Sequence, residues 1–304
     1  FLLDAQKVSP AVLRQDEQLR RILVRDWLER DFYAARYMQA LRKNILVQAV
    51  QGKQDYTRYI PSGTRLVIMG EIHQQNWMVN EVERAILQLK ARYPDKNIYY
   101  ASEFVDASDS EQLYILQHEY DVERLVRKRP YYRAVTGRLM KAGVRVVGLE
   151  PPDLSEEFIR VGGRSFSRQS AFAWKAVSAV AVRERNLYWA RIIRRIYEQD
   201  PRALVVVHAG MGHTNYNQSI ALPWLLKEYK PFVTEFSERN IQLNTLLNRH
   251  VPFSEEVYSQ ARSLLCKDPI LPVYFVRHLK SKRAAVSLGC DLSIYRVDPK
   301  ELYE

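Results

Sequence analysis

An acid and a histidine follow a short apolar run in the first third of the chain. Residues 65–69 read RLVIM, a run that is too short for a helix and typical of a buried parallel strand. Gly70 breaks this run, and Glu71 and His73 come directly after it. A carboxylate and an imidazole so placed can exchange protons with a substrate or bind a metal ion.

The same arrangement returns further along the chain. Residues 203–207 read ALVVV and lead through His208 and Gly210 to His213. The spacing G-x-x-H therefore occurs twice, each time after an apolar run of five residues. Ligands of open α/β sheets bind outside the carboxyl ends of the strands, which is where both motifs lie.

Acidic residues mark the ends of two further apolar runs. Residues 97–104 read NIYYASEF and contain Glu103, and residues 144–149 read VRVVGL and precede Glu150. A carboxylate at an apolar strand end is costly unless it is paired or coordinates a ligand. A fifth strand is predicted at 232–236.

These groups support two kinds of chemistry if they converge at one end of a sheet. His73, Glu103 and His213 are a sufficient ligand set for a catalytic divalent metal such as Mn, Co or Zn. Without a metal, Glu71 or Glu103 can act as a base with a histidine as its acid partner. The alternative is structural: His208 and His213 cap strands, and Glu71 accepts hydrogen bonds from backbone amides.

The predicted strands alternate with helical patterns, which indicates an α/β fold with a mostly parallel central sheet flanked by helices. We predict helices at 113–120 with Asp109 or Ser110 as N-cap, at 121–143 with an interruption at Pro130, at 171–199 and around 222–229. Residues 153–170 form a loop that either covers a site or is simply a long connection.

The chain divides into three predicted parts. Residues 1–58 form a helical N-terminal extension without a strand, residues 59–240 the α/β core, and residues 241–304 a small α+β extension. The N-terminal extension has one apolar face, which either packs on the domain or docks a protein partner; packing is the commoner role of such a face. The C-terminal part contains β-like runs at 273–277, 284–288 and 292–297, which form an antiparallel edge or an appended subdomain.

Composition excludes some functions. The 46 basic and 35 acidic residues give a net charge of +11, but both signs are interleaved and no nucleic-acid-binding motif is present. We therefore expect a solvated basic surface and no nucleic-acid partner.

No window of the sequence reaches the roughly 18 apolar residues of a transmembrane span. The first residue is Phe1 rather than Met, which is consistent with a removed leader and favours an exported or cell-envelope location.

Cys266 and Cys290 are the only cysteines of the chain. They lie far from both histidine motifs and lack the spacing of metal ligands, so neither is a candidate nucleophile. They are either two buried thiols or one disulfide, and their number does not decide the compartment.

Taken in order, several motifs resemble the Tiki, TraB, ChaN and erythromycin-esterase superfamily. They are GEIH, SEF, VVGLE, ERNLYWARII and VVVHAGMGHTNY, followed by LLKEYKPFVTEF, within residues 62–240. The resemblance implies an α/β fold built from two similar βα halves. The segment EFVDASDSEQLYILQHEY is similar to the ChaN branch, whereas the paired G-x-x-H motifs and ERNLYWA are similar to Tiki and TraB. GEIH lacks the extra residue of the esterase motif GExxH.

The resemblance also implies roles for residues. His73, Glu103 and His213 would form the centre of the site, with Glu71 and Arg185 as supporting groups. His208 is a further catalytic candidate, but from its position before His213 rather than from the resemblance. Arg185 would stabilise an oxyanion or bind a substrate carboxylate or phosphate.

The function expected first is a metal-dependent hydrolase that acts on a small molecule or a peptide. The alternative is a non-catalytic, ChaN-like binding or assembly module of the cell envelope. Such a module would bind haem, or a protein partner through the basic N-terminal extension.

Overall fold

The computed structural model describes residues 14–22, 25, 45–72, 75–107, 113–126, 130–151, 179–216, 218–237, 254–280, 282, 285–286 and 289–302. The predicted site residue His73, the predicted N-caps Asp109 and Ser110, and the predicted loop at 153–170 lie outside these ranges.

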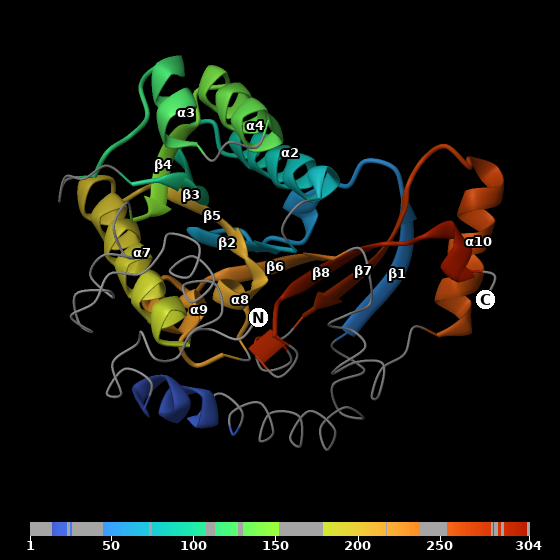
Figure 1. Ribbon diagram of the computed structural model, residues 1–304. Coiled ribbons are helices and arrows are strands. Elements are labelled where there is room, and N and C mark those ends of the chain that lie inside the picture. Colours follow the sequence, from blue (N-terminus) through green and yellow to red (C-terminus); the bar gives the residue numbers. More distant parts are fainter. Residues whose placement is uncertain are drawn as a thin grey trace.

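A single sheet organises the described residues, with strand order β1-β7-β8-β6-β2-β5-β3-β4 (Figure 1). The strands are β1 (Ile45–Gln51), β2 (Leu66–Glu71), β3 (Ile98–Asp106), β4 (Arg145–Glu150), β5 (Leu204–Gly210), β6 (Phe232–Ser237), β7 (Val273–Leu279) and β8 (Leu292–Arg296). Strands β2 to β6 and β8 run parallel to their neighbours among themselves, and β7 is antiparallel to both β1 and β8. The predicted α/β class with a mostly parallel sheet is confirmed.

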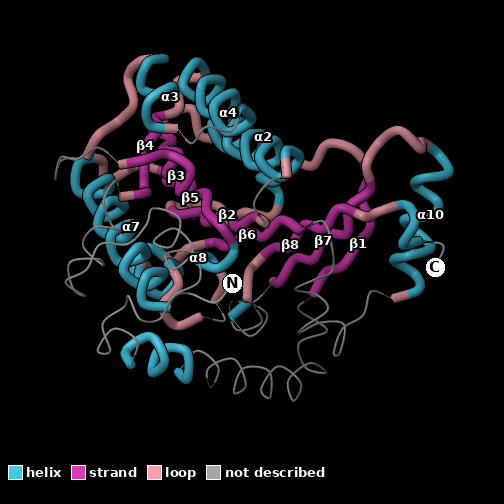
Figure 2. The backbone as a smooth tube through the Cα atoms, viewed as in Figure 1, coloured by secondary structure: helices cyan, strands magenta, loops and turns pink. Residues whose placement is uncertain are grey.

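Helices cover both faces of this sheet (Figure 2). They are α2 (Asn76–Arg92), α3 (Glu119–Leu125), α4 (Pro130–Lys141), α7 (Ala179–Gln199), α8 (Met211–Thr214), α9 (Leu222–Leu225) and α10 (Glu255–Lys267). Short 3₁₀ helices lie at Tyr56–Arg58, Lys227–Tyr229 and Pro299–Leu302. One apolar core lies between the sheet and α2, α3 and α4, and a second between the sheet and α7, α9 and α10.

Strand sequences explain this two-sided burial. In β2, Val67 and Met69 belong to the core under α2, while Leu66 and Ile68 belong to the core under α7. Successive side chains of a strand point to opposite faces, so a strand that is covered on both sides needs a continuous apolar run. This is why RLVIM and ALVVV lack the polar alternation of a half-exposed strand.

Strand β1 corrects the prediction that residues 1–58 contain no strand. Ile45 falls at helical spacing from Leu41 and was assigned to the apolar face of a helix, but Ile45–Gln51 pairs with β7. Its alternating Ile45, Val47 and Ala49 pack on the core of the α7 face. A strand with one partly solvated face carries period-2 alternation, and that pattern decides the structure here.

The described part of the N-terminal extension is joined to α7. Residues 14–22 are helical, and the buried Asp16 accepts a hydrogen bond from the backbone N–H of Val180 on α7 at 3.1 Å. Both roles of the apolar face, packing on the domain and docking of a partner, stay predictions. No helix among the described residues has the length and apolar character needed to cross a membrane.

The C-terminal strands complete the sheet as an antiparallel edge, one of the two predicted arrangements, because β8 pairs with β6 and β7 with β8. The strand predicted at 284–288 is wrong at residues 285 and 286, which are helical. The reason is topological: β7 and β8 are antiparallel, so the chain must turn back between Leu279 and Leu292.

The helix predicted at 113–120 is wrong for its first part. Ile115 forms an isolated antiparallel bridge with Val147 of β4. Helix α3 begins only at Glu119, because the Asp121 carboxylate accepts hydrogen bonds from the backbone N–H groups of Gln117 (2.9 Å) and His118 (3.1 Å). Those bonds satisfy donors at the start of the helix.

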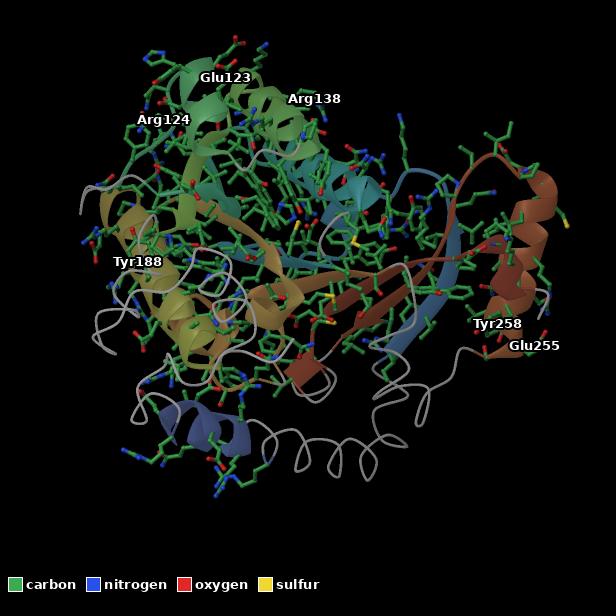
Figure 3. The ribbon with its side chains drawn as sticks, viewed as in Figure 1. Glu123, Arg124, Arg138, Tyr188, Glu255 and Tyr258 are labelled. Carbon is green, nitrogen blue, oxygen red and sulfur yellow. The ribbon has the colours of Figure 1, made fainter. Side chains whose placement is uncertain are left out.

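The surface of α3 and α4 carries charged side chains of both signs. Glu123 and Arg124 of α3 and Arg138 of α4 are exposed and point away from the sheet (Figure 3). The two cysteines are free thiols, with Cys290 buried and Cys266 exposed, so neither the disulfide nor a pair of buried thiols is present.

Candidate functional site

The described residues of the predicted site lie at the carboxyl-terminal ends of the parallel strands, but in two separate clusters. Glu103, Arg185 and His213 meet in one cluster, and Glu71 and His208 meet in another. Each of the five is at most 5% exposed. We call these the Arg185 cluster and the Glu71 cluster.

The Arg185 guanidinium, on α7, holds the first cluster together. Its Nη2 donates to Glu103 Oε1 and Glu150 Oε2, both at 2.7 Å, and its Nε lies 3.1 Å from the same Glu150 oxygen. Its Nη1 lies 3.0 Å from His213 Nε2. Burial alone would lower the pKa of Arg185, but Glu103 and Glu150 more than offset it and the pKa is raised. Arg185 is therefore a permanent cation between two carboxylates.

Hydrogen bonds fix the tautomer of His213. Asn186 donates from Nδ2 to the Ile220 carbonyl at 2.8 Å, so its Oδ1, which lies 2.7 Å from His213 Nδ1, must accept. His213 consequently carries its proton on Nδ1, and its Nε2 lone pair accepts from Arg185. Trp189 contacts both groups, with its ring 4.4 Å from the imidazole and 4.9 Å from the guanidinium carbon.

An irregularity in β3 places Glu103. Ser102 pairs with Gly148 and Asp106 with Glu150, so β3 takes four residues over the distance that β4 covers in two. Glu103 lies in the extra length, and its Oε2 accepts the Gly210 N–H at 2.7 Å. Such bulges re-aim side chains next to sites.

Close packing explains the glycine of the first G-x-x-H motif. A Cβ at Gly70 would overlap Thr214 Oγ1 of α8. Because position 70 has no side chain, α8 lies directly on β2, and this contact brings His213 to Arg185.

The Glu71 cluster lies on the opposite face, under α4. His208 Nε2 is 3.0 Å from Glu71 Oε2, close but not aligned as a hydrogen bond. Tyr132 donates to Glu71 Oε1 at 2.5 Å, and the Tyr100 hydroxyl lies 2.8 Å from His208 Nδ1. The ring of Phe104 packs edge-on against the imidazole at 4.8 Å.

A third set of buried polar residues includes Asn215, the residue that follows α8. Asn215 donates to Glu235 of β6 at 2.7 Å, and Arg277 of β7 donates to Ser293 at 2.7 Å and lies 3.9 Å from the Cys290 sulfur. Burial raises the pKa of Glu235 to about 7, although Arg277 opposes the shift. Sequence reasoning assigned no role to this group.

Glu103 and His213 do not fit a metal ion as they stand. Both Glu103 oxygens accept N–H groups, and the Nε2 lone pair of His213 is directed at the Arg185 guanidinium. A divalent cation between the two would adjoin a fixed positive charge. Among the described residues there is no group of three or more His, Cys, Asp or Glu that could hold a metal, and His73, the remaining predicted ligand, lies outside them.

Comparisons with known proteins show similarity at the level of structure alone. No protein-family model and no curated protein matches the chain. An erythromycin esterase, a mutant of EreC in its open conformation, is similar with a TM-score of 0.46 and 9% identity, over 82% of this chain and 97% of the esterase. A ChaN structure from Campylobacter jejuni, described with cofacial haem binding, has a TM-score of 0.38 and 10% identity, over 77% and 88%.

The type III effector HopBA1 has a TM-score of 0.36 and 15% identity, over 57% of this chain and 76% of the effector. The names ChaN and erythromycin esterase are those of the superfamily that the sequence motifs resemble. All three TM-scores are below 0.5, so function must be argued from the residues.

Proposed function

We propose that this chain is a hydrolase that cleaves an ester or peptide bond by acid–base chemistry of its own side chains. Two clusters of ionisable groups at the strand ends, where ligands of such sheets bind, support this. The Arg185 cluster gathers two carboxylates and a neutral imidazole from β3, β4 and α8, and the Glu71 cluster contains the carboxylate that precedes His73 in the sequence.

We assign His73, two residues after Glu71, as the general base. Its neutral imidazole takes a proton from water as the water oxygen attacks the carbonyl carbon, and the imidazolium then returns the proton to the leaving group. The carboxylate of Glu71, at the end of β2, stabilises that imidazolium, as acidic partners of catalytic histidines do. Arg185, bound to two carboxylates, positions Glu103 and His213 rather than serving as an oxyanion donor.

Mutation of His73 tests the proposal. Hydrolysis of 4-nitrophenyl butyrate and of quenched-fluorescent casein would be measured for the wild type, His73→Ala and His73→Gln. We expect both variants to lose at least about 100-fold in kcat because they lack the base. His118→Ala is the matched control, since His118 is exposed at the start of α3. Full activity in both His73 variants would refute the assignment.

Elemental analysis distinguishes this mechanism from the metal-dependent one. The wild type, His73→Ala and His213→Ala would be analysed after incubation with Mn, Co or Zn. We expect no stoichiometric metal that depends on both histidines. One metal ion per chain that is lost in both variants would instead support the ligand set His73, Glu103 and His213.

The second candidate is a binding module of the cell envelope without turnover. It is favoured by the burial of every described site residue and by the engagement of their polar atoms with one another. His208 and His213 do not fit haem as a pair of axial iron ligands, because both ring nitrogens of each histidine already contact neighbouring side chains. A Soret band on haem titration, or capture of one protein through residues 1–58, would support binding.

A further inference from the structure

Two tyrosines from different elements contact the Glu71 cluster through their hydroxyl groups. Tyr132 of α4 donates to Glu71 Oε1 at 2.5 Å, and the hydroxyl of Tyr100, on β3, lies 2.8 Å from His208 Nδ1. All four side chains are almost fully buried. The four groups form an unbroken chain of contacts across β3, β5, β2 and α4.

Tyr100 and Glu71 together determine which nitrogen of His208 carries the proton. Burial raises the pKa of Tyr100 far above its ordinary value, so the phenol keeps a proton to donate. The carboxylate oxygen Glu71 Oε2, 3.0 Å from Nε2, can only accept, so the ring proton lies on Nε2 and Nδ1 accepts from Tyr100. Glu71 thus has an O–H group at one oxygen and an N–H group close to the other.

The side chain of Tyr132 is itself fixed by its neighbours. Its ring stacks on Phe104 with centroids 4.0 Å apart and planes 11° apart. Burial and the neighbouring Glu71 both raise the pKa of Tyr132, so its hydroxyl keeps the proton that it donates to the carboxylate. The carboxylate therefore has one preferred orientation at the end of β2.

Other buried tyrosines donate to backbone carbonyls or to carboxylates away from the carboxyl-terminal ends of the parallel strands. Tyr197 donates to the Arg65 carbonyl at 2.7 Å. Tyr216 donates to the Pro231 carbonyl at 2.9 Å and to Asp291 at 3.0 Å, and Tyr56 donates to Glu81 at 2.5 Å. Backbone carbonyls are the usual partners of side-chain donors with a structural role. What distinguishes Tyr100 and Tyr132 is the place of their partners, which are an imidazole and a carboxylate at these strand ends, and the carboxylate lies two residues before His73 in the sequence.

We propose that Tyr132 and Tyr100 are positioning residues of the hydrolytic site. Tyr132 fixes the orientation of Glu71, and Tyr100 holds His208 in the tautomer whose N–H group faces the same carboxylate. The inference rests on the proposed function, in which Glu71 stabilises the charged form of the base.

Kinetics of three matched variants test this role. Tyr132→Phe and Tyr100→Phe each remove one hydroxyl, and Tyr197→Phe is the control at the opposite end of β2. We expect kcat for 4-nitrophenyl butyrate to fall by about 10- to 100-fold in the first two, as for loss of a hydrogen bond to a charged network, with KM unchanged. In a Glu71→Gln background, Tyr132→Phe should have little further effect. Equal kcat in all three single variants would overturn the proposal.

Nitrogen NMR of His208 decides the geometry without any activity. The wild type should show a protonated Nε2 and a hydrogen-bonded Nδ1. Tyr100→Phe should move the Nδ1 resonance toward that of a free pyridine-type nitrogen, and Tyr132→Phe should move the Nε2 resonance; Tyr197→Phe should move neither. If the wild type hydrolyses nothing, the proposed function fails and these shifts alone decide the inference. Unchanged His208 resonances in all variants would overturn it.

Discussion

Arg185 shows how three charged side chains can be buried together. Glu103 and Glu150 lie against one guanidinium whose three nitrogens all have partners. Removing one member of a buried charge network costs more than the network itself contributes, because the remaining charges lose their compensation. The stability of the strand ends therefore depends on this single side chain.

We predict that Arg185→Met lowers the free energy of unfolding by about 3–5 kcal/mol at neutral pH. Urea denaturation measures the change. Arg21→Met is the control, because the pair of Arg21 with Glu17 is solvent-exposed and should contribute less than about 1 kcal/mol. Equal losses in the two variants would contradict the role of Arg185.

Glu235 predicts a pH dependence of stability. Its pKa is about 7 in the folded chain, raised from 4.5 by burial. As pH rises from 4.5 to 7, the unfolded chain releases this proton while the folded chain keeps it, so stability falls by an amount on the order of 3 kcal/mol. Below pH 4.5 both states are protonated and the contribution vanishes.

Glu235→Gln removes this titration and keeps an oxygen for Asn215. We expect the free energy of unfolding of the variant, relative to the wild type, to increase steadily between pH 4.5 and 8. Urea denaturation across that range measures it. A difference that is constant with pH would show that Glu235 ionises normally.

At the residue scale, sequence reasoning placed Glu71, Glu103 and His208 at the strand ends where they lie, but it did not predict the faces to which their side chains point. Glu103 and His213 were expected beside Arg185, and they meet it. Glu71 and His208 were expected in the same site, but His208 pairs with Met69, so both side chains point to the α4 face. The face of the sheet to which Glu103 points depends on the β3 bulge, which no residue pattern in the sequence predicts.

The β3 bulge is an element-scale feature that depends on one glycine. A Cβ at Gly148 would overlap the backbone carbonyl of Asp106. Backbone atoms cannot move aside as a flexible side chain can, so the close approach of β3 and β4 requires glycine at this position. The placement of Glu103 follows from it.

We predict that Gly148→Ala destabilises the protein by about 1–3 kcal/mol, the usual cost of overpacking. Gly137→Ala, on α4, should instead stabilise it by up to about 1 kcal/mol, since nothing lies within 4 Å of the added Cβ and alanine favours a helix. Thermal denaturation shows whether each variant is less or more stable than the wild type. Stabilisation by Gly148→Ala would show that β3 and β4 do not approach each other closely at Gly148.

Strands buried on both faces were predictable, and half-exposed extended segments were not. The five predicted core strands each begin within one residue of the observed start, because a continuous apolar run has few ways to be buried. β1 and residues 113–117 were assigned to helices, since their apolar residues also fit helical spacing and only pairing with distant strands decides their form.

At the scale of the whole molecule, the N-terminal and C-terminal parts share one sheet with the core. β1 covers the edge of β7, which in turn joins β8 and β6. Without β1, a row of unpaired backbone groups on an apolar strand would face solvent and could pair with another chain.

Two truncations test this arrangement. Removal of residues 1–44 keeps β1, and we expect a soluble, folded monomer. Removal of residues 1–51 exposes the β7 edge, and we expect aggregation. Light scattering and size-exclusion chromatography distinguish the two, and a monomeric product from both truncations would contradict the prediction.

The one-turn helix α8 has a further consequence. Its His213 contacts Arg185, and Asn215, the residue that follows it, contacts Glu235. A ligand that displaced α8 on one side would therefore also alter the contact on the other, and thermodynamic linkage would make the two binding free energies depend on each other equally. Four residues thus connect two chemically distinct interiors.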